Sequence, residues 1–430
     1  MSLAVGSPAL GTVPLAGYPY LPGYVSPVDS PFPLLLFEMA ATTNPLDPSP
    51  TWVGFLVDDL EEFDVSQCGR GTILDSPSAG TAKFVYDVSR DRDLDVTNPS
   101  SPFAAYLKEN CRFRLRMVHD GVTWPICEDY VNTLSVPYQV GSWFEALTDI
   151  DLSDGFKILA QTPLTGMTAR PKERADLRVT AILDYAGWPT TRRAVSTGRT
   201  ILSAEDISAM SALDALLTVD NTECGRLGID PAGNLVFLSR RDLSQAARQT
   251  VSQATFSDSA VSGTIPYEAV APERSDKLLR TVVEITHPTE PTITLDAGMS
   301  PKVKYSREVR DATTAARNAT GEHFLSTLKT SQMVVPGITV DASDSPPGFA
   351  TGLYGKMASL HVGDRVTVER LFPPAGGDAF SQDCFIESKR DWAVRGEHTW
   401  MVELGFSFAP PVVTGDEWGT GKWGTAKWGW

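Results

Sequence analysis

The stretch CRFRLRMVHDGVTWPICEDYV, residues 111–131, gives the strongest indication of the fold. Its first half alternates apolar side chains with arginines, and this period of two is typical of a β-strand with one buried face. His-Asp-Gly then supplies turn residues before a second apolar run, which predicts a β-hairpin. Other short period-two segments, such as TAKFVYDV (81–88), are separated by Asp, Pro, Ser and Gly. We therefore expect a small β-barrel or sandwich over residues 51–146.

Mixed helix and strand patterns fill the next part of the chain, residues 147–262. KERADLRVTAILDYAGWP (172–189) predicts a helix that stops at its Gly and Pro. SAEDISAMSALDALLTV (203–219) opens with residues at capping-box spacing and carries one apolar stripe, which predicts a second helix. RLGIDPAGNLVFLSRR (226–241) predicts a hairpin around its Asp-Pro-Ala-Gly-Asn turn. These residues are predicted to form a middle α/β domain.

Period two returns over residues 263–410. The clearest strands there are DRVTVERLF (364–372) and HTWMVELGFSF (398–408). Residues 308–332 interrupt them with a pattern that predicts an inserted helix. The sequence thus predicts a mainly β chain in which two β domains bracket the α/β domain.

Both ends of the chain combine aromatic residues with Pro or Gly. Residues 1–50 have Pro or Gly every few positions, and residues 411–430 contain the repeat WGTGKWGTAKWGW. A solvated linker would contain more Ser, Glu and Lys, so we expect both ends to be extended arms that dock on other surfaces. The alternative is a disordered tail with incidental aromatic residues. The predicted docking residues are Tyr18, Tyr20, Tyr24, Trp418, Trp423, Trp428 and Trp430.

Composition excludes several classes of protein. A net charge of −16 argues against nucleic-acid binding, although DNA could pass such a surface without adhering. No apolar run reaches the roughly 18 residues of a membrane span, so we expect no membrane anchor. The five cysteines form no Cys-x-x-Cys pair and the five histidines lack ligand spacing, so we predict no metal site and no cofactor. This cysteine usage favours synthesis in a reducing cytoplasm.

Catalytic motifs are missing from the sequence. It contains no nucleophile elbow, phosphate-binding loop, zinc-protease motif or dinucleotide fingerprint, so we predict no catalytic residue. The acidic runs at 57–64 and 148–154 could offer paired carboxylates or a Ca²⁺ site, but we interpret them as solvated faces. Arg112, Arg114 and Arg116 share one strand face, which we predict to be a charged face between subunits. Contact with DNA phosphates is the alternative, and the overall acidity argues against it.

Four parts of the sequence together resemble the baseplate hub, or tail-tip minor tail protein, of long-tailed, siphovirus-like phages that infect actinobacteria. These parts are residues 65–117, with Gly-Arg-Gly and Ala-Gly-Thr-Ala segments; residues 181–203 and 216–242, with AGWP and the TECGRLGIDPAGNLVF hairpin; residues 360–371 and 383–407; and the Leu/Gly- and Trp/Gly-containing ends. The resemblance covers most of residues 51–410.

The resemblance implies a structural role and a particular architecture. The two β domains of the chain would be related, tail-tube-like barrels. The protein would be a homotrimer at the virion tail tip and would continue the tail tube. The implied partners are the distal tail protein ring, other minor tail proteins, the central fibre and the tape-measure protein, with DNA passing unbound during ejection. One alternative is a hexameric distal tail ring protein. Another is a cell-wall glycan-binding or degrading tail protein, with Trp143 or Trp188 as a stacking platform.

Overall fold

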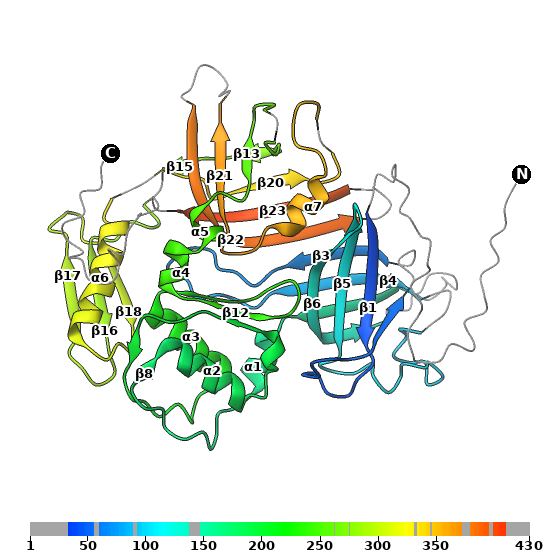
Figure 1. Cartoon of the computed structure of the whole chain (residues 1–430), viewed down its shortest axis with the longest axis horizontal. Coiled ribbons are helices and arrows are strands. Elements are labelled where there is room, and N and C mark those ends of the chain that lie inside the picture. The colour runs from blue at the N-terminus through cyan, green and yellow to red at the C-terminus, as the bar shows by residue number, and fades with distance from the viewer. Residues whose placement is uncertain are drawn as a thin grey trace, which may run out of the picture.

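The computed structural model describes residues 33–55, 60–88, 93–136, 147–261, 263–274, 276–330, 333–344, 346–371, 379–394 and 399–409. Within these residues the main feature is a mostly antiparallel sheet of 13 strands (Figure 1). These strands are β1 (Leu34–Ala40), β2 (Trp52–Phe55), β3 (Leu60–Ser66), β4 (Thr81–Asp87), β5 (Arg112–His119), β6 (Val122–Ser135), β7 (Leu147–Ser153), β13 (Thr255–Ser257), β14 (Ala269–Val270), β20 (Gly337–Asp341), β21 (Arg365–Arg370), β22 (Phe380–Val394) and β23 (Thr399–Phe408). Their order is β14-β20-β23-β22-β3-β4-β7-β6-β5-β1-β2, with β21 paired to β22 and to β13.

The hairpin predicted from residues 111–131 is confirmed. β5 pairs antiparallel with β6, and the two turn residues, Asp120 and Gly121, have φ angles of 51° and 73°. Positive φ at both central positions is the geometry whose twist matches that of the flanking strands. The apolar residues that alternate with the arginines are fully buried, namely Phe113, Leu115 and Met117. The alternation therefore identified the core face of β5 correctly.

Strand β1 lies in the segment that the sequence analysis included in the N-terminal arm. The Pro-rich stretch ends at Pro33, and Leu34–Ala40 contains no Pro or Gly, so every residue can take part in a strand. β1 pairs with β5 on one side and β2 on the other. Its side chains Phe37 and Met39 are fully buried. Residues 34–40 are thus an interior strand of the sheet and not part of a docking arm.

One sheet runs through both β domains. We call β1–β7 the first β lobe, and β13, β14 and β20–β23 the second β lobe. β22 pairs antiparallel with β3 and so joins the lobes edge to edge. The order of the described strands is an open path, and no closed barrel is found among them.

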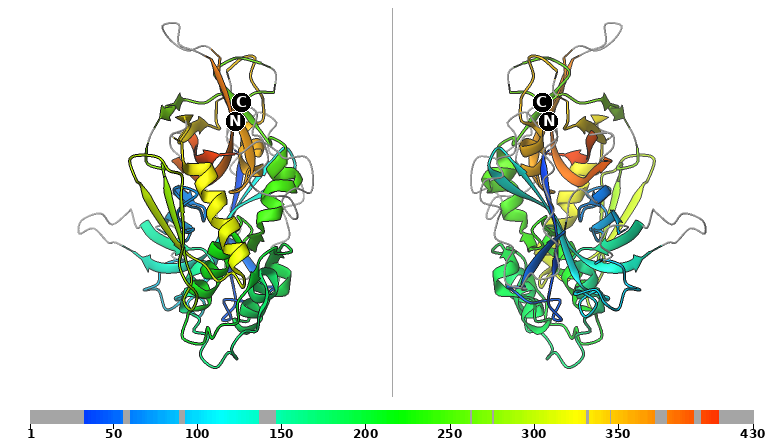
Figure 2. Two further views of the ribbon diagram at one scale, coloured as in Figure 1. Left: turned by 90° about the vertical axis from the view of Figure 1, so that its left-hand side faces the viewer. Right: turned by 90° about the vertical axis from the view of Figure 1, so that its right-hand side faces the viewer.

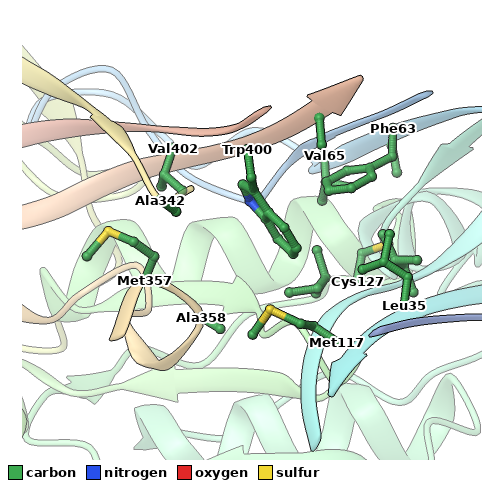
Figure 3. Close-up of a cluster of buried hydrophobic side chains, with 14 of the residues drawn as sticks. Leu35, Phe63, Val65, Met117, Cys127, Ala342, Met357, Ala358, Trp400 and Val402 are labelled. Atoms are coloured by element: carbon green, nitrogen blue, oxygen red, sulfur yellow. The ribbon is translucent and has the colours of Figure 1, made fainter. Parts of the chain in front are cut away.

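The two lobes also share one hydrophobic core. Figure 3 shows side chains from both lobes packed together, with Phe63 and Met117 of the first lobe near Trp400 and Val402 of the second. The rings of Phe63 and Trp400 meet edge to face with centroids 5.1 Å apart. Helix α7 (Leu353–Ser359) packs into the same core. Because the apolar contacts cross the boundary between the lobes, neither lobe buries its apolar face without the other.

The middle domain has a separate core and lies beside the sheet (Figure 1). Its elements are α1 (Phe156–Gln161), β8 (Glu173–Arg174), α2 (Ala175–Tyr185), the 3₁₀ helix η2 (Thr190–Arg192), β9 (Arg193–Val195), β10 (Ile201–Leu202), α3 (Ala212–Glu223), β11 (Arg226–Ile229), β12 (Leu235–Leu238), α4 (Arg240–Gln245) and α5 (Ala247–Thr250). Helix α2 and the β11–β12 hairpin confirm two predictions. Helix α3 begins nine residues after the predicted start at residue 203, because Ser211 is its N-cap and accepts a hydrogen bond from the amide of Asp214.

A small unit inserted into the second lobe has its own core. Figure 2 shows the ribbon of this unit from the side. It contains β16 (Val282–Thr286), β17 (Ile293–Asp296), β18 (Lys304–Glu308) and α6 (Thr314–Leu328), and β15 (Glu273–Arg274) pairs with β19 (Met333–Val334) beside it. Helix α6 confirms the helix predicted within residues 308–332. A Cβ at Gly321 would lie 2.7 Å from the Leu295 side chain, so this glycine lets α6 approach the strands closely. None of the described helices is long and apolar enough to cross a membrane.

Candidate assembly site

The aromatic residues predicted to dock the two arms lie outside the described residues. These are Tyr18, Tyr20, Tyr24, Trp418, Trp423, Trp428 and Trp430. Their docking on other subunits therefore stays a prediction.

The predicted charged face of β5 finds partners within the chain. Arg114 and Arg116 each donate two hydrogen bonds to the carboxylate of Glu38 on β1, with N–O distances of 2.7 to 3.0 Å. The Arg114 guanidinium also lies 3.9 Å from the centroid of the Trp52 ring, a cation–π contact. These two arginines thus support the edge formed by β1 and β2. Contact of this face with another subunit stays a prediction.

Arg112, the third arginine of this face, is buried against the middle domain. Glu128 on β6 accepts hydrogen bonds from Arg112 at 3.2 Å and from Arg192 of η2 at 2.6 Å. Arg192 also donates to the Tyr130 hydroxyl at 3.1 Å and to the carbonyl oxygen of Gly233 at 2.9 Å. Burial lowers the pKa of Arg112, and the nearby charge of Arg192 lowers it further. One carboxylate thus holds two arginines at the boundary between the first lobe and the middle domain.

A second buried carboxylate, Glu387 on β22, connects three parts of the molecule. It accepts hydrogen bonds from Arg70 of the first lobe at 2.8 Å and from Arg226 of the middle domain at 2.7 Å. The hydroxyl of Ser407 on β23 is a further donor. Burial by itself raises the pKa of Glu387, but the charges of Arg226 and Arg70 outweigh it and hold the pKa below its usual value. We call Glu387 with Arg70 and Arg226 the Glu387 junction.

Two residues farther along β22, Lys389 holds helix α7. Its ammonium group donates to the carbonyl oxygen of Met357 at 2.8 Å, in the last turn of the helix. Asp391 forms an ion pair with Lys389 at 3.4 Å and accepts a hydrogen bond from the Trp400 indole at 3.3 Å. Lys389 and Asp391 are each about 1% exposed in their side chains. This pair fixes α7 against the core that the two lobes share.

Two carboxyl groups, Asp129 and Asp154, line a small cavity between the first lobe and the β11–β12 hairpin. Asp154 accepts hydrogen bonds from the amides of Gly80 and Phe156, at 2.7 and 2.9 Å. Burial raises the pKa of Asp154 to about 7. Burial also raises the pKa of Asp129, and the charges of Asp154 and Glu128 add to this effect. The acidic run at 148–154 thus ends in a buried acid and not on a solvated face.

The described residues contain no cluster of three His, Cys, Asp or Glu side chains that could hold a metal ion. They do contain one contact that resembles a nucleophile and its base, between the Ser203 hydroxyl and Nε2 of His287 at 3.3 Å. However, the amide of Thr289 donates to Nδ1 of the same ring, so the proton of the neutral ring lies on Nε2. His287 therefore donates to Ser203 and cannot take its proton as a general base.

Trp188 is a core residue of the middle domain. It is 1% exposed, and its indole donates to the carbonyl oxygen of Arg192 at 2.8 Å. A Cβ at Gly155 would lie 2.3 Å from the indole ring, so Gly155 makes room for it. A ring enclosed in this way cannot stack on a glycan. Trp143, the other residue considered for that role, lies outside the described residues.

The fold has counterparts among solved structures. No family model matches the sequence, and no curated protein matches it. The structure is similar to the tail protein from Neisseria meningitidis MC58, with a TM-score of 0.55, 14% identity, and coverage of 88% of this chain and 99% of that one. It is also similar to the 43 kDa tail protein of prophage MuSo2 from Shewanella oneidensis, with a TM-score of 0.53, 10% identity, and coverage of 87% and 98%.

The chain has the tail-protein fold. The two likenesses each extend over almost the whole of the other chain, so they concern the complete arrangement of lobes and middle domain. At the level of fold they agree with the resemblance to phage tail proteins noted in the sequence. The finer resemblance, to hubs of phages that infect actinobacteria, is taken up as a proposal below.

Sequence reasoning did not find the buried polar residues that join the parts of this fold. Glu387, Lys389 and Asp391 stand in the run FIESKRD, whose charge density is typical of an exposed strand. The available signal was their spacing of two, which places all three on one face of a strand. Three charges on one face of a strand that begins with apolar residues could have indicated a buried ionic contact.

Proposed function

We propose that this chain is a structural protein of a phage tail and forms the trimeric hub at the tail tip. The observation that carries the proposal is the agreement of its fold with two tail proteins, one of them from a prophage, along nearly the full length of each. The resemblance of the four sequence parts to hub proteins supports the position at the tip. The proposal places the protein in the virion.

The arrangement of the lobes is compatible with a ring of three subunits. Each chain contributes two β lobes joined edge to edge by β22 and β3. Three chains around one axis would therefore place six lobes in a ring. Such a ring would match the six subunits of a hexameric tail tube. β2 and β14 end the strand order at opposite sides of the described sheet, so each has an edge available to a neighbouring subunit. Ring closure through these edges would complete the barrel-like arrangement that the resemblance implies.

The net charge of the chain is consistent with a channel through which DNA passes. A chain with a net charge of −16 repels the phosphate backbone, and DNA can move past such a surface without binding. In this role the protein needs no catalytic residue and no cofactor. Its partners would be other copies of itself, the distal tail protein ring, other minor tail proteins, the central fibre and the tape-measure protein.

The copy number in the assembled particle tests the proposal. We would purify the full chain, measure its mass by native mass spectrometry, and reconstruct the particle by electron cryomicroscopy without imposed symmetry. Three copies around an open channel would support the hub. Six copies would indicate the distal tail ring, and release of soluble fragments from peptidoglycan by the purified protein would indicate a cell-wall-degrading protein. Either result would overturn the proposal.

A further inference from the structure

Three carboxyl groups line the small cavity between the first lobe and the β11–β12 hairpin. We call it the acidic cavity. Asp129 comes from β6, Asp154 directly follows β7, and Asp230 lies in the turn of the hairpin. The cavity has a volume of about 10 Å³, which is room for one water molecule or one small ion. None of the described residues that line it is Lys, Arg or His, so its wall carries no positive charge.

The carboxyl group of Asp129 has no hydrogen-bond partner among the described residues. The residue is only 5% exposed. Its oxygens nevertheless keep some accessible surface, because they are not among the fully enclosed polar atoms that lack a partner. On a residue as buried as this, the remaining surface faces the cavity that it lines. A buried carboxylate without hydrogen bonds or a counter-charge is costly, so the site favours a ligand that brings positive charge.

Asp154 offers further acceptor capacity to the same cavity. Each of its oxygens accepts one hydrogen bond, from the amides of Gly80 and Phe156 at 2.7 and 2.9 Å. An ionised carboxylate has about four acceptor positions, so each oxygen can bind one more group. Asp154 is also close enough to Asp129 for its charge to raise the pKa of that acid. A cation between the two carboxylates would remove this repulsion.

Other buried carboxylates of the molecule have a cationic side chain beside them. Glu387 is paired with Arg70 and Arg226, and Asp364 is paired with Arg248. These ion pairs offset the cost of taking a carboxylate out of water. The acidic cavity is buried in a similar way, but its wall provides no such side chain. A cation from solution would take the place that arginine takes at the other sites.

The geometry of the cavity favours a hard cation that gives up its waters readily. Cys68 and Cys127 also line the wall, but zinc requires three or four protein ligands around one point, and the described residues contain no such group of three. Hard cations bind carboxylate oxygens and accept water as the remaining ligands. Mg²⁺ keeps several waters, whereas this cavity has room for about one. Ca²⁺ fits better, because its coordination is more flexible.

We propose that the acidic cavity binds one Ca²⁺ ion between Asp129 and Asp154. Oxygens of both carboxylates coordinate the ion, and water supplies the remaining ligands. Of the acidic run at 148–154, for which the sequence analysis considered Ca²⁺, only Asp154 lines the cavity, and its partner lies on the adjacent strand β6. Because the hairpin of the middle domain forms the opposite wall, the ion stabilises the contact between that domain and the first lobe. This site goes beyond the proposed role in the tail and does not depend on it.

Titration of the purified full chain with CaCl₂ at pH 8 tests the site. Methyl NMR follows Ile126 and Ile229, which line the cavity, and Ile338 in the core of the second lobe is the internal control. Two carboxylate ligands should give a Kd of about 1 mM, at the weak end of protein Ca²⁺ sites. With this Kd and an m-value of about 3 kcal/mol/M, 10 mM Ca²⁺ should raise the urea midpoint by about 0.5 M.

Asp129→Asn removes the charge of one ligand and keeps the shape of the side chain. The Kd should rise about tenfold or more, because the charge of the ligands sets the affinity. The increase in urea midpoint at 10 mM Ca²⁺ should then fall below about 0.15 M. Asp151→Asn is the matched control, because Asp151 is an exposed acid on β7 outside the cavity. This variant should bind Ca²⁺ like the unaltered protein.

Three results would overturn the inference. The first is the absence of any shift of the Ile126 and Ile229 methyl groups at 10 mM Ca²⁺. The second is equal affinity for Mg²⁺, which would place the ion outside the cavity with its waters retained. The third is an unchanged Kd in Asp129→Asn, which would place the ion on another acidic surface. The methyl titration of the unaltered protein decides the question even if this variant does not fold.

The Ca²⁺ readout is separate from the copy number of the assembled particle. A six-copy particle would refute the hub and leave the Ca²⁺ result standing. A three-copy particle that shows no Ca²⁺ binding would refute the site and leave the hub standing.

Discussion

Replacement of Glu387 by glutamine tests whether the Glu387 junction holds the parts of the molecule together. The Glu387 side chain is 1% exposed, and its two partners, Arg70 and Arg226, are 13% and 7% exposed. Glutamine keeps the shape of the side chain and removes the charge, so two buried guanidinium groups lose their shared counter-ion. Loss of one partner of a buried ion pair costs about 3–5 kcal/mol. We expect Glu387→Gln to lower the free energy of unfolding by about this amount.

Urea titration followed by tryptophan fluorescence measures the effect. With an m-value of about 3 kcal/mol/M, a loss of 3–5 kcal/mol lowers the urea midpoint by about 1 to 1.7 M. Because the junction joins three parts of the chain, we also expect the transition to broaden or to divide into steps. Protonation should act like the substitution. The pKa of Glu387 is held below its usual value, so the stability it contributes is present above about pH 4.5 and is lost as the pH falls through the folded-state pKa.

Asp64→Asn is the matched control. Arg390, three residues beyond Glu387 on β22, donates two hydrogen bonds to Asp64 on β3, the closer at 2.6 Å. This pair also joins the two lobes, but the side chains of Arg390 and Asp64 are 46% and 32% exposed. Exposed pairs contribute at most about 1 kcal/mol, so the midpoint should move by less than about 0.3 M. Equal shifts for Glu387→Gln and Asp64→Asn would refute the argument that burial sets the strength of the junction.

Three further perturbations follow from the structure. Burial raises the pKa of Asp154 from 3.8 to about 7 and also raises the pKa of Asp129. The stability that these neutral acids contribute is therefore present below about pH 4 and should be lost as the pH rises to about 7. The urea midpoint should be higher at pH 5 than at pH 8, and Asp129→Asn should reduce this difference. Deletion of residues 418–430 should abolish oligomers of the purified chain in native mass spectrometry without changing the urea midpoint, because we expect the Trp side chains to dock on other copies. An unchanged oligomer would contradict docking on other copies. Gly69→Ala places a Cβ 2.3 Å from the carbonyl oxygen of Glu387 and should cost about 1–3 kcal/mol in the same titration, whereas an unchanged midpoint would show that this contact relaxes freely.

Features that depend on local periodicity could be predicted from the sequence. The hairpin at 111–131 follows from alternation and an Asp-Gly turn, and both determinants lie within a few residues of each other. The hairpin at 226–241 is of the same kind. In both hairpins the side chains that define the strands are also those that bury their apolar face. The helix within 308–332 differs, because the residues that α6 buries include Arg317, Thr320 and Gly321 and form no apolar stripe.

The start of α3 shows where local signals become ambiguous. Within residues 203–219 the spacing Ser-x-x-Asp occurs twice, at Ser203 and at Ser211, and each could begin a helix. Ser211 is the residue that caps the helix, because the backbone from Ser203 onward forms hydrogen bonds with other segments of the chain. The amide of Ser203 donates to the carbonyl of Arg310, and Glu205 exchanges backbone hydrogen bonds with Arg170. These partners are distant in the sequence, so local propensity could not decide between the two caps.

The Glu387 junction depends on a change of face within a single strand. β22 has an irregularity in its pairing with β23 just after Ile386. Before it, Cys384 and Ile386 point into the core; after it, Glu387, Lys389 and Asp391 are the buried residues. A shift of one residue moves every following side chain to the other face of a strand, so a bulge here turns a run of charges inward. The sequence around position 387 does not alternate, because Cys-Phe-Ile is followed by Glu-Ser-Lys-Arg-Asp, so it does not mark where the face changes. The pairing of β22 with β23 on one side and β3 on the other shows which of these charges are buried between the parts of the chain.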